Sequence, residues 1–492
     1  MSLASIHFLL FVLILVALYY LFPAKQRWMM LFVGNCYFIL QCNGLASSII
    51  MLLELAMTYV AACMIEKRRS YQRQIKWIWL ICVFILVTVW VLLKEINSGL
   101  SQLAPLGISY YTLMLISYLC DVYWGIVEAE KNPLKFTVFA GYFPLLYSGP
   151  IVRYGKEGKL FCADTKFCFP EIKKGILRIL WGLFKKLVIA ERLAVIVNTV
   201  YEGYEQYYGL YICIAATLFT LQLYADFSGC MDIVLGISVI FGIKLPENFN
   251  LPFMAGSLSE FWRRWHITLG EWLKDYVLYP ILKSSCWQAY GKRLTRRFGK
   301  KLGKKIPVWS GLLISWFLIG AWHGGGWNYI FGVGIFMGVS IVLGEIFQPL
   351  FQKLIMYLHI KTDCFSWKLF QIIRTVVLFV FGNSFFRANS LKQGLALWRN
   401  AFLLWNPWVL FDGSMQKLGL DEKNMNVLLA ALLILAAGGL ARLYLKGSVI
   451  EWIEKQNLLF RWMVYLGAFF AIMTYGCYGS GYNAQDFIYA GF

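Results

Sequence analysis

Long apolar runs recur along almost the whole chain and leave little room for a water-soluble core. A transmembrane helix needs about 20 apolar residues. The clearest runs lie at 3–22, 45–64, 77–93, 104–122, 175–200, 206–225, 329–348, 368–386, 427–445 and 460–478. Shorter runs at 28–42, 136–152, 230–243 and 309–322 are candidates for re-entrant or interfacial segments. The pattern predicts an all-α polytopic membrane protein with about 11 to 14 transmembrane and re-entrant helices.

Composition agrees with a membrane protein, since 60% of the 492 residues are hydrophobic and 15% are charged. A soluble domain carries roughly 25% charged residues. The net charge of +20 would suggest nucleic acid as the partner of a soluble protein. Here the basic clusters at 65–75 and 292–305 are typical of loops that stay in the cytoplasm, where the second can also touch anionic lipid. We therefore expect a lipid bilayer and no nucleic acid.

The two ends of the chain are predicted to differ in role. The run at 3–22 has no basic leader and no small-residue cleavage site, so we interpret it as a retained first transmembrane helix. Basic flanks place residues 479–492 outside the cytoplasm as a C-terminal tail. We expect one integral membrane domain over 1–492, in the plasma (inner) membrane.

Of the four histidines, His323 carries the strongest functional signal. It lies in "GAWHGGGWNYIFGVG" between two apolar runs, and its glycines permit close approach of another backbone or a ligand. An ionisable residue at membrane depth indicates function by default, and an imidazole suits general-base chemistry. The alternative is a neutral imidazole bonded to a helix carbonyl in a tightly packed bundle. His7 and His359 are typical of interfacial or solvated side chains.

The segment "SEFWRRWHITLGEWLKDYVLYP" (259–280) contains His266 amid unusual charge density. As a helix it would place Trp262 and His266 on one face, and its tryptophans, Trp265 and Trp272 among them, suit an amphipathic helix at the membrane interface. Taken alone, the segment favours that structural role. The sequence has no GxSxG nucleophile motif and no HxxxH spacing, so we expect no metal site.

Together, the 259–280 segment and "GAWHG" resemble the membrane-bound O-acyltransferase (MBOAT) family. More narrowly, they resemble its bacterial branch that O-acetylates alginate and other exported polysaccharides. Further similar segments are "PLGISYYTLMLISYLCDVYWG", "GYFPLLYSGPIVRY", "LQLYADFSGCMDIVLGISVIFGIKLPENFN" and "FGNSFFRANS". The resemblance covers the chain from about residue 100 to its end. The chain departs from it at "YPILKSSC", where the branch often has Pro-Leu-Gly-Gly after its Leu-Tyr.

This resemblance implies a ring of helices around a central funnel, with the 259–280 segment lining the funnel from the cytoplasmic side. It implies that His323 is the catalytic base and that His266 is the second family histidine. Arg263 and Arg264 would bind a phosphate-rich donor, or would instead pair with acidic neighbours such as Glu260 and Asp275. The other residues expected at the donor or funnel surface are Trp262, Asp226, Asp275 and Trp322.

The C-terminal tail ends in "DFIYAGF", and the family resemblance suggests that Tyr489 carries the acyl group as a tyrosyl ester. The alternative is that the apolar residues around it merely anchor the tail.

The resulting hypothesis is a membrane O-acyltransferase that moves an acetyl group from a cytoplasmic thioester towards an exported polysaccharide. No bound cofactor is expected, with acetyl-CoA or another acyl thioester as donor and an extracytoplasmic esterase-type acetyltransferase as partner. Two alternatives remain open: D-alanyl transfer to teichoic acid, and a transporter or flippase. Asp226, Asp232 and His323 would suit a transporter, but the sequence shows no pair of related halves.

Overall fold

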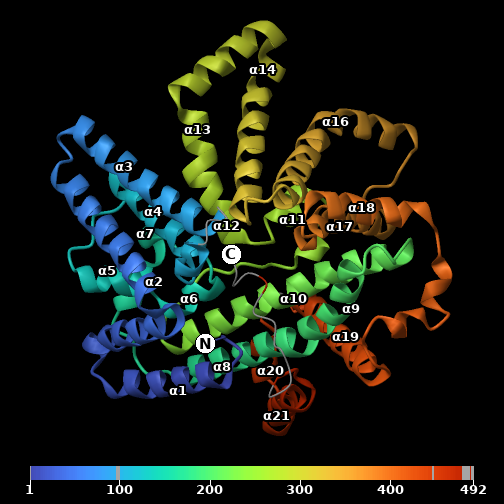
Figure 1. Cartoon of the computed structure of the whole chain (residues 1–492), viewed down its shortest axis with the longest axis horizontal. Coiled ribbons are helices and arrows are strands. Elements are labelled where there is room, and N and C mark those ends of the chain that lie inside the picture. The colour runs from blue at the N-terminus through green and yellow to red at the C-terminus, as the bar shows by residue number, and fades with distance from the viewer. Residues whose placement is uncertain (1, 96–99, 446–447, 479–487, 489–492) are drawn as a thin grey trace. The chain divides into compact units, whose positions relative to one another are not determined.

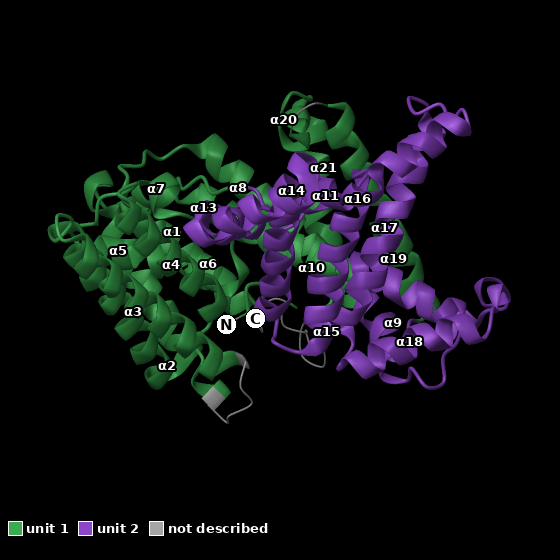
Figure 2. Cartoon of the chain, turned by 90° about the horizontal axis from the view of Figure 1, so that it is seen from above, with its two compact units in different colours: residues 1–192, 222–246, 421–492 green, residues 193–221, 247–420 purple. Residues whose placement is uncertain are grey.

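The computed structural model describes residues 2–95, 100–445, 448–478 and 488, and its regular structure is helical (Figure 1). Within these residues, the isolated bridge between Phe249 and Trp265 is the one β-type contact. The chain divides into two compact units, each built from separate stretches of sequence (Figure 2). Unit 1 comprises 1–192, 222–246 and 421–492, and unit 2 comprises 193–221 and 247–420.

The prediction of an all-α polytopic membrane protein is confirmed. Among the described residues, eight helices are long and apolar enough to cross a membrane. They are Ala24–Lys67, Gln72–Lys94, Leu210–Ile240, Ser285–Trp322, Trp327–Tyr357, Phe365–Arg387, Glu422–Tyr444 and Leu458–Tyr475. The number is below the predicted 11 to 14, partly because neighbouring apolar runs join into single helices. The runs at 28–42 and 45–64 form α2 (Arg27–Lys67), bent at Gly44, and those at 206–225 and 230–243 form α10 (Leu210–Ile240).

Unit 1 packs its helices closely through glycine. Its helices are α1 (Ile6–Leu21), α2, α3 (Gln72–Trp90), α4 (Ile108–Trp124), α5 (Pro133–Ala140), α6 (Phe143–Ser148), α7 (Tyr154–Glu157), α8 (Phe169–Leu183), the second part of α10, α19 (Glu422–Tyr444), α20 (Val449–Glu454) and α21 (Leu458–Tyr475). A Cβ on Gly182 would lie 2.6 Å from the Gly229 carbonyl oxygen, and one on Gly175 would lie 2.6 Å from that of Gly236. The small residues therefore let the backbones of α8 and α10 touch.

Unit 2 holds both histidine segments. Its helices are the first part of α10, most of α9 (Glu191–Glu202), α11 (Leu258–Trp262), α12 (Ile267–Leu273), α13 (Tyr279–Lys283), α14 (Ser285–Trp322), α15 (Trp327–Tyr329), α16 (Met337–Tyr357), α17 (Phe365–Arg387) and α18 (Leu391–Leu403). A π-helical turn, η7 (Lys274–Leu278), links α12 to α13, and another, η8 (Ile330–Phe336), links α15 to α16.

The basic cluster at 292–305 lies on a helical hairpin, contrary to the predicted loop. Within α14 the backbone reverses at Gly299, whose φ of 79° is left-handed and favours glycine. The two legs then pack together, since a Cβ on Gly303 would lie 2.3 Å from the Thr295 Cα. The legs are visible at the top of Figure 1.

Candidate active site

His266 is positioned by the extended "NFN" residues 248–250. Ile267 donates its backbone N–H to the Asn248 carbonyl at 3.1 Å, and Asn250 donates to the Arg264 carbonyl at 2.9 Å. The Asn248 side-chain oxygen also accepts from the backbone N–H and the hydroxyl of Thr268, at 3.0 and 2.9 Å. Asn248 therefore accepts hydrogen bonds from the first two backbone N–H groups of α12, which begins directly after His266. These groups have no partner within the helix.

The prediction of one helix through 259–280 is wrong at this point. Helix α11 ends at Trp262, and His266 adopts a left-handed backbone with φ 46°. That conformation is uncommon for a residue with a Cβ and interrupts a right-handed helix. The predicted interfacial tryptophans are also corrected, since Trp265 and Trp272 are 2% and 5% exposed within unit 2.

The other histidine, His323, caps the C-terminal end of α14. Its backbone N–H bonds to the Ile319 carbonyl at 3.2 Å, and the chain then turns through Gly324 and Gly325, which both have positive φ. The predicted close backbone approach occurs one turn earlier, at Gly320. A Cβ there would lie 2.7 Å from the Ile330 Cα, so glycine allows α14 to pack directly against η8.

Both histidines contact the same tryptophan. The Trp322 ring centroid lies 5.9 Å from that of His266 and 4.9 Å from that of His323, both in edge-on contacts. The His323 imidazole also contacts the Phe386 ring, and the two ring centroids lie 5.4 Å apart. The row His266–Trp322–His323–Phe386 is buried in unit 2, where the two histidines are 3% and 2% exposed.

Burial sets the protonation state of the two imidazoles. It lowers the pKa of His266, with a further contribution from the nearby His323, and the burial of His323 disfavours the charged form of its ring in the same way. Both rings are therefore neutral near pH 7. A neutral imidazole has one nitrogen that accepts a proton and one N–H that donates a hydrogen bond. The pair can thus serve as a base and as a hydrogen-bond donor.

Asn328 ties the loop after His323 to the "FFRA" end of α17. Its amide nitrogen donates to the Ala388 carbonyl at 2.7 Å and to the Phe385 carbonyl at 3.4 Å. These bonds fix the stretch that carries Phe386 against His323. Asn248, Asn328 and Phe386 are not among the predicted site residues, although Asn248 and Phe386 lie in segments that carry the family resemblance and Asn328 follows His323 by five residues.

The predicted arginines have separate environments. Arg264 forms an ion pair with Glu260 at 2.6 Å, which agrees with acidic pairing and not with a free phosphate-binding group. Arg263 is exposed on the same segment. Trp262 packs its ring against Trp316 at 4.9 Å, and Asp275 lies half-buried in η7.

Asp226 belongs to unit 1, where it is part of a buried ionic cluster. Its Oδ1 lies 2.7 Å from the Lys186 Nζ, which also lies 2.9 Å from the Glu191 carboxylate. Its Oδ2 accepts the backbone N–H of Ile488, in the C-terminal tail, at 2.7 Å. Asp226 and Lys186 are 1% and 3% exposed. The predicted carrier residue Tyr489 lies outside the described residues.

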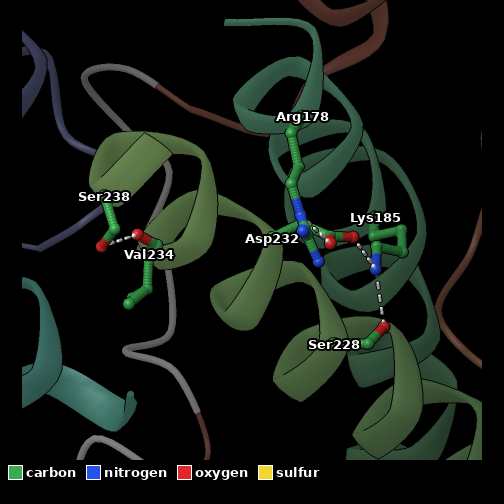
Figure 3. Close-up of polar contacts among 6 residues, drawn as sticks. All are labelled: Arg178, Lys185, Ser228, Asp232, Val234 and Ser238. Carbon is green, nitrogen blue, oxygen red and sulfur yellow. Dashed lines mark hydrogen bonds and ion pairs between the residues drawn. The ribbon is translucent and has the colours of Figure 1, made fainter. Parts of the chain in front are cut away.

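A second ionic cluster, which is half-buried, lies six residues further along α10 (Figure 3). Asp232 binds the Arg178 Nε at 2.9 Å and the Lys185 Nζ at 2.6 Å, and Lys185 also donates to Ser228 at 2.8 Å. Arg178, Lys185 and Lys186 are not among the predicted site residues, because all three lie within the apolar run at 175–200. Across the described ranges, no group of three or more His, Cys, Asp or Glu side chains is arranged to hold a metal ion.

The Asn248 contacts make a first prediction. Asn248→Leu removes the acceptor that orders Thr268 while keeping side-chain size, so His266 loses its fixed backbone. We expect a roughly tenfold or greater fall in any turnover that uses His266, since small misplacements at a site cost about this much or more. Asn250→Leu is the control, because Asn250 contributes its backbone to the pairing with Arg264. Equal activity of the Asn248 variant and wild type would contradict the positioning role.

The structure defines a multi-pass membrane protein with a buried pair of histidines. Residues 74–291 match the model of the MBOAT, membrane-bound O-acyltransferase family, and the chain therefore carries an MBOAT domain. It is 30% identical over 350 residues to the probable alginate O-acetylase AlgI of Pseudomonas aeruginosa, covering 70% of this chain and 59% of that protein. The predicted family is confirmed.

Other relatives act on other envelope polymers, according to their names. The peptidoglycan O-acetyltransferase of Helicobacter pylori is 29% identical over 331 residues, covering 61% of this chain and 57% of that protein. The teichoic acid D-alanyltransferase of Streptococcus thermophilus is 27% identical over 290 residues, covering 57% and 66%. The chain spans about three fifths of the length of the alginate O-acetylases that it matches.

Proposed function

We propose that this protein is an O-acyltransferase of the plasma (inner) membrane that transfers an acetyl group from a cytoplasmic thioester towards an exported cell-surface polysaccharide. The observation that carries the proposal is the buried His266–Trp322–His323 row in a chain with an MBOAT domain. Relatives named as O-acetylases of alginate and of peptidoglycan support acetyl as the group and a glycan as the destination.

The two neutral imidazoles divide the chemistry between them. His323 accepts the proton of the attacking hydroxyl as its oxygen bonds to the thioester carbonyl carbon. The N–H of His266 donates to the carbonyl oxygen as negative charge develops there. The carbon–sulfur bond then breaks, and the departing thiolate takes the proton from His323. The products are an oxygen ester and a free thiol, so atoms and charges balance.

Tyr489 is the proposed first acceptor of the acetyl group. The hydrogen bond from the Ile488 backbone N–H to the buried carboxylate of Asp226 supports this role, because it attaches the residue next to Tyr489 to unit 1. A tyrosyl ester is activated enough for onward transfer. An extracytoplasmic esterase-type acetyltransferase would then pass the group to the polysaccharide.

The alternative of D-alanyl transfer keeps the same chemistry and changes the acyl group. The teichoic acid D-alanyltransferase relative supports it at lower identity than the O-acetylases. Incubation with acetyl and D-alanyl thioesters in parallel separates the two.

The carrier role of Tyr489 is tested by labelling the protein itself. Purified protein in nanodiscs is incubated with acetyl-CoA labelled in its acetyl group, and label on the polypeptide is measured. We expect Tyr489→Phe to remove at least about nine tenths of the label, because the phenol oxygen is the attacking atom. Tyr478→Phe is the control, since Tyr478 is an exposed tyrosine near the same end of the chain. Label that persists on Tyr489→Phe would place the acyl group on another residue.

A further inference from the structure

The α14 hairpin carries an unusual concentration of unpaired positive charge. Between Asp275 and Glu345 the sequence has no acidic residue. The hairpin bears eight exposed cations: Lys292, Arg293, Arg296, Arg297, Lys300, Lys301, Lys304 and Lys305. Within the part of the chain that the structure describes, these eight form no ion pair with a carboxylate. This surface therefore attracts anions from outside the chain.

A groove of about 530 Å³ lies between the two legs of the hairpin. The turn at Gly299 lets the legs run back along each other, and the Trp287 indole N–H bonds across to the Pro307 carbonyl at 3.0 Å. That bond braces the legs on either side of the groove. The groove lies entirely within unit 2.

The lining of the groove combines the groups that recognise a nucleotide bearing phosphates. Its polar and aromatic members are Trp287, Gln288, Lys292, Thr295, Arg296 and Lys304. Three cations are present for phosphate oxygens. The Trp287 ring presents a face for stacking on a base. The side chains of Gln288 and Thr295 donate to the Lys283 and Gly291 carbonyls and keep their oxygens as acceptors. Apolar atoms of Leu282, Pro307 and Val308 complete the lining. Small-molecule sites typically combine such an apolar lining with a few placed polar groups.

The position of the groove relative to His323 matches the shape of a coenzyme A thioester. From Pro307 the helix runs without a further break to its end beside His323. At 1.5 Å per residue the separation is about 24 Å. In coenzyme A, the pantetheine arm and pyrophosphate separate the thiol from the adenosine by a distance of this order. A nucleotide held in the groove would therefore leave the thioester able to reach the histidines.

We propose that the α14 groove is the binding site for the 3′-phospho-ADP end of an acyl-coenzyme A donor. This inference rests on the proposed acyl-transfer function and specifies its donor class. Anionic lipid shares the phosphate chemistry, and the tip of the hairpin suits it better than the groove does. Phe298 and Leu302, at the tip and outside the groove, are 48% and 46% exposed beside basic neighbours.

The test compares two triple variants of the full-length protein in zwitterionic nanodiscs. The groove variant is Lys292→Gln, Arg296→Gln and Lys304→Gln. The matched control is Arg293→Gln, Arg297→Gln and Lys301→Gln, which removes the same charge from the same hairpin outside the groove. Binding of coenzyme A is measured by calorimetry, with 3′,5′-ADP as a competitor that lacks the pantetheine arm. We expect at least tenfold weaker binding in the groove variant, less than threefold in the control, and competition by 3′,5′-ADP on wild type.

Each other outcome overturns the proposal. Equal weakening in both variants would show diffuse electrostatic attraction, and unchanged binding in the groove variant would place the nucleotide elsewhere. A groove used by lipid would show no competition by 3′,5′-ADP, and the groove variant would lose affinity for phosphatidylglycerol vesicles instead. The readout does not depend on turnover. Tight coenzyme A binding without acyl transfer would contradict the proposed function and leave the groove assignment intact. Acyl transfer by the wild-type protein, together with unchanged coenzyme A binding in the groove variant, would contradict only the groove assignment.

Discussion

Replacing His323 with alanine is expected to lower acetyl transfer about 1,000-fold, because general-base catalysis contributes a factor of this order. His323→Gln should lose a similar amount. Glutamine keeps a hydrogen-bonding side chain of comparable size, but it cannot take a proton from a hydroxyl. The measurement is the rate at which free coenzyme A forms from acetyl-CoA, at saturating donor, with the protein in nanodiscs.

His359→Gln is the matched control, because His359 lies outside the buried row and is exposed. We expect it to retain wild-type turnover. The result that contradicts the account is near-normal activity in His323→Gln together with normal folding. A transporter would tolerate that substitution, since a hydrogen-bonding side chain suffices to line a path.

Asp232→Asn is expected to destabilise the protein by about 3 kcal/mol, the low end of the cost of removing the partner of a buried charge, since the side chains of Lys185 and Asp232 are 4% and 15% exposed. The carboxylate lies between Arg178 and Lys185, so asparagine at this position removes the negative charge that both cations contact. Lys185 is 3% exposed, and water cannot compensate it fully. Thermal unfolding in a fixed detergent, followed by circular dichroism, measures the change.

Glu260→Gln is the control for this prediction. It breaks the Glu260–Arg264 pair, whose side chains are 32% and 29% exposed. A pair that water reaches in this way is worth at most about 1 kcal/mol. Similar shifts in unfolding temperature for both variants would refute the special cost assigned to the Asp232 cluster.

The sequence sufficed for the fold class, because helix length and apolar composition are local properties. It also indicated His323 correctly as a residue set among close-packing glycines, since those glycines stand beside it in the chain. The buried location of both histidines and their shared contact with Trp322 needed the structure. The central funnel and the catalytic roles remain predictions.

Other features could not be predicted, for physical reasons that differ. The left-handed backbone of His266 lies between two residues, Arg264 and Ile267, whose backbones bond to Asn250 and Asn248, and a residue with a Cβ carries no sequence signal for that conformation. The cations Arg178 and Lys185 pair with Asp232, which lies about 50 residues away in the sequence. The mean hydropathy of the apolar run that contains them gives no sign of the two charges. The hairpin at 292–305 looked like a polar loop because its charges face outward from helical legs, and only Gly299 marks the reversal.

The most direct test of the central claim is whether the purified wild-type protein cleaves an acyl thioester and forms an oxygen ester. Acetyl-CoA labelled in the acetyl group is added to the protein in nanodiscs, and both free coenzyme A and hydroxylamine-labile acetyl ester are measured over time. The account predicts that the two products appear together and that His323→Ala yields neither. If neither the acetyl nor the D-alanyl thioester is cleaved by the wild-type protein, from coenzyme A or from a carrier protein, the proposed acyltransferase function is contradicted.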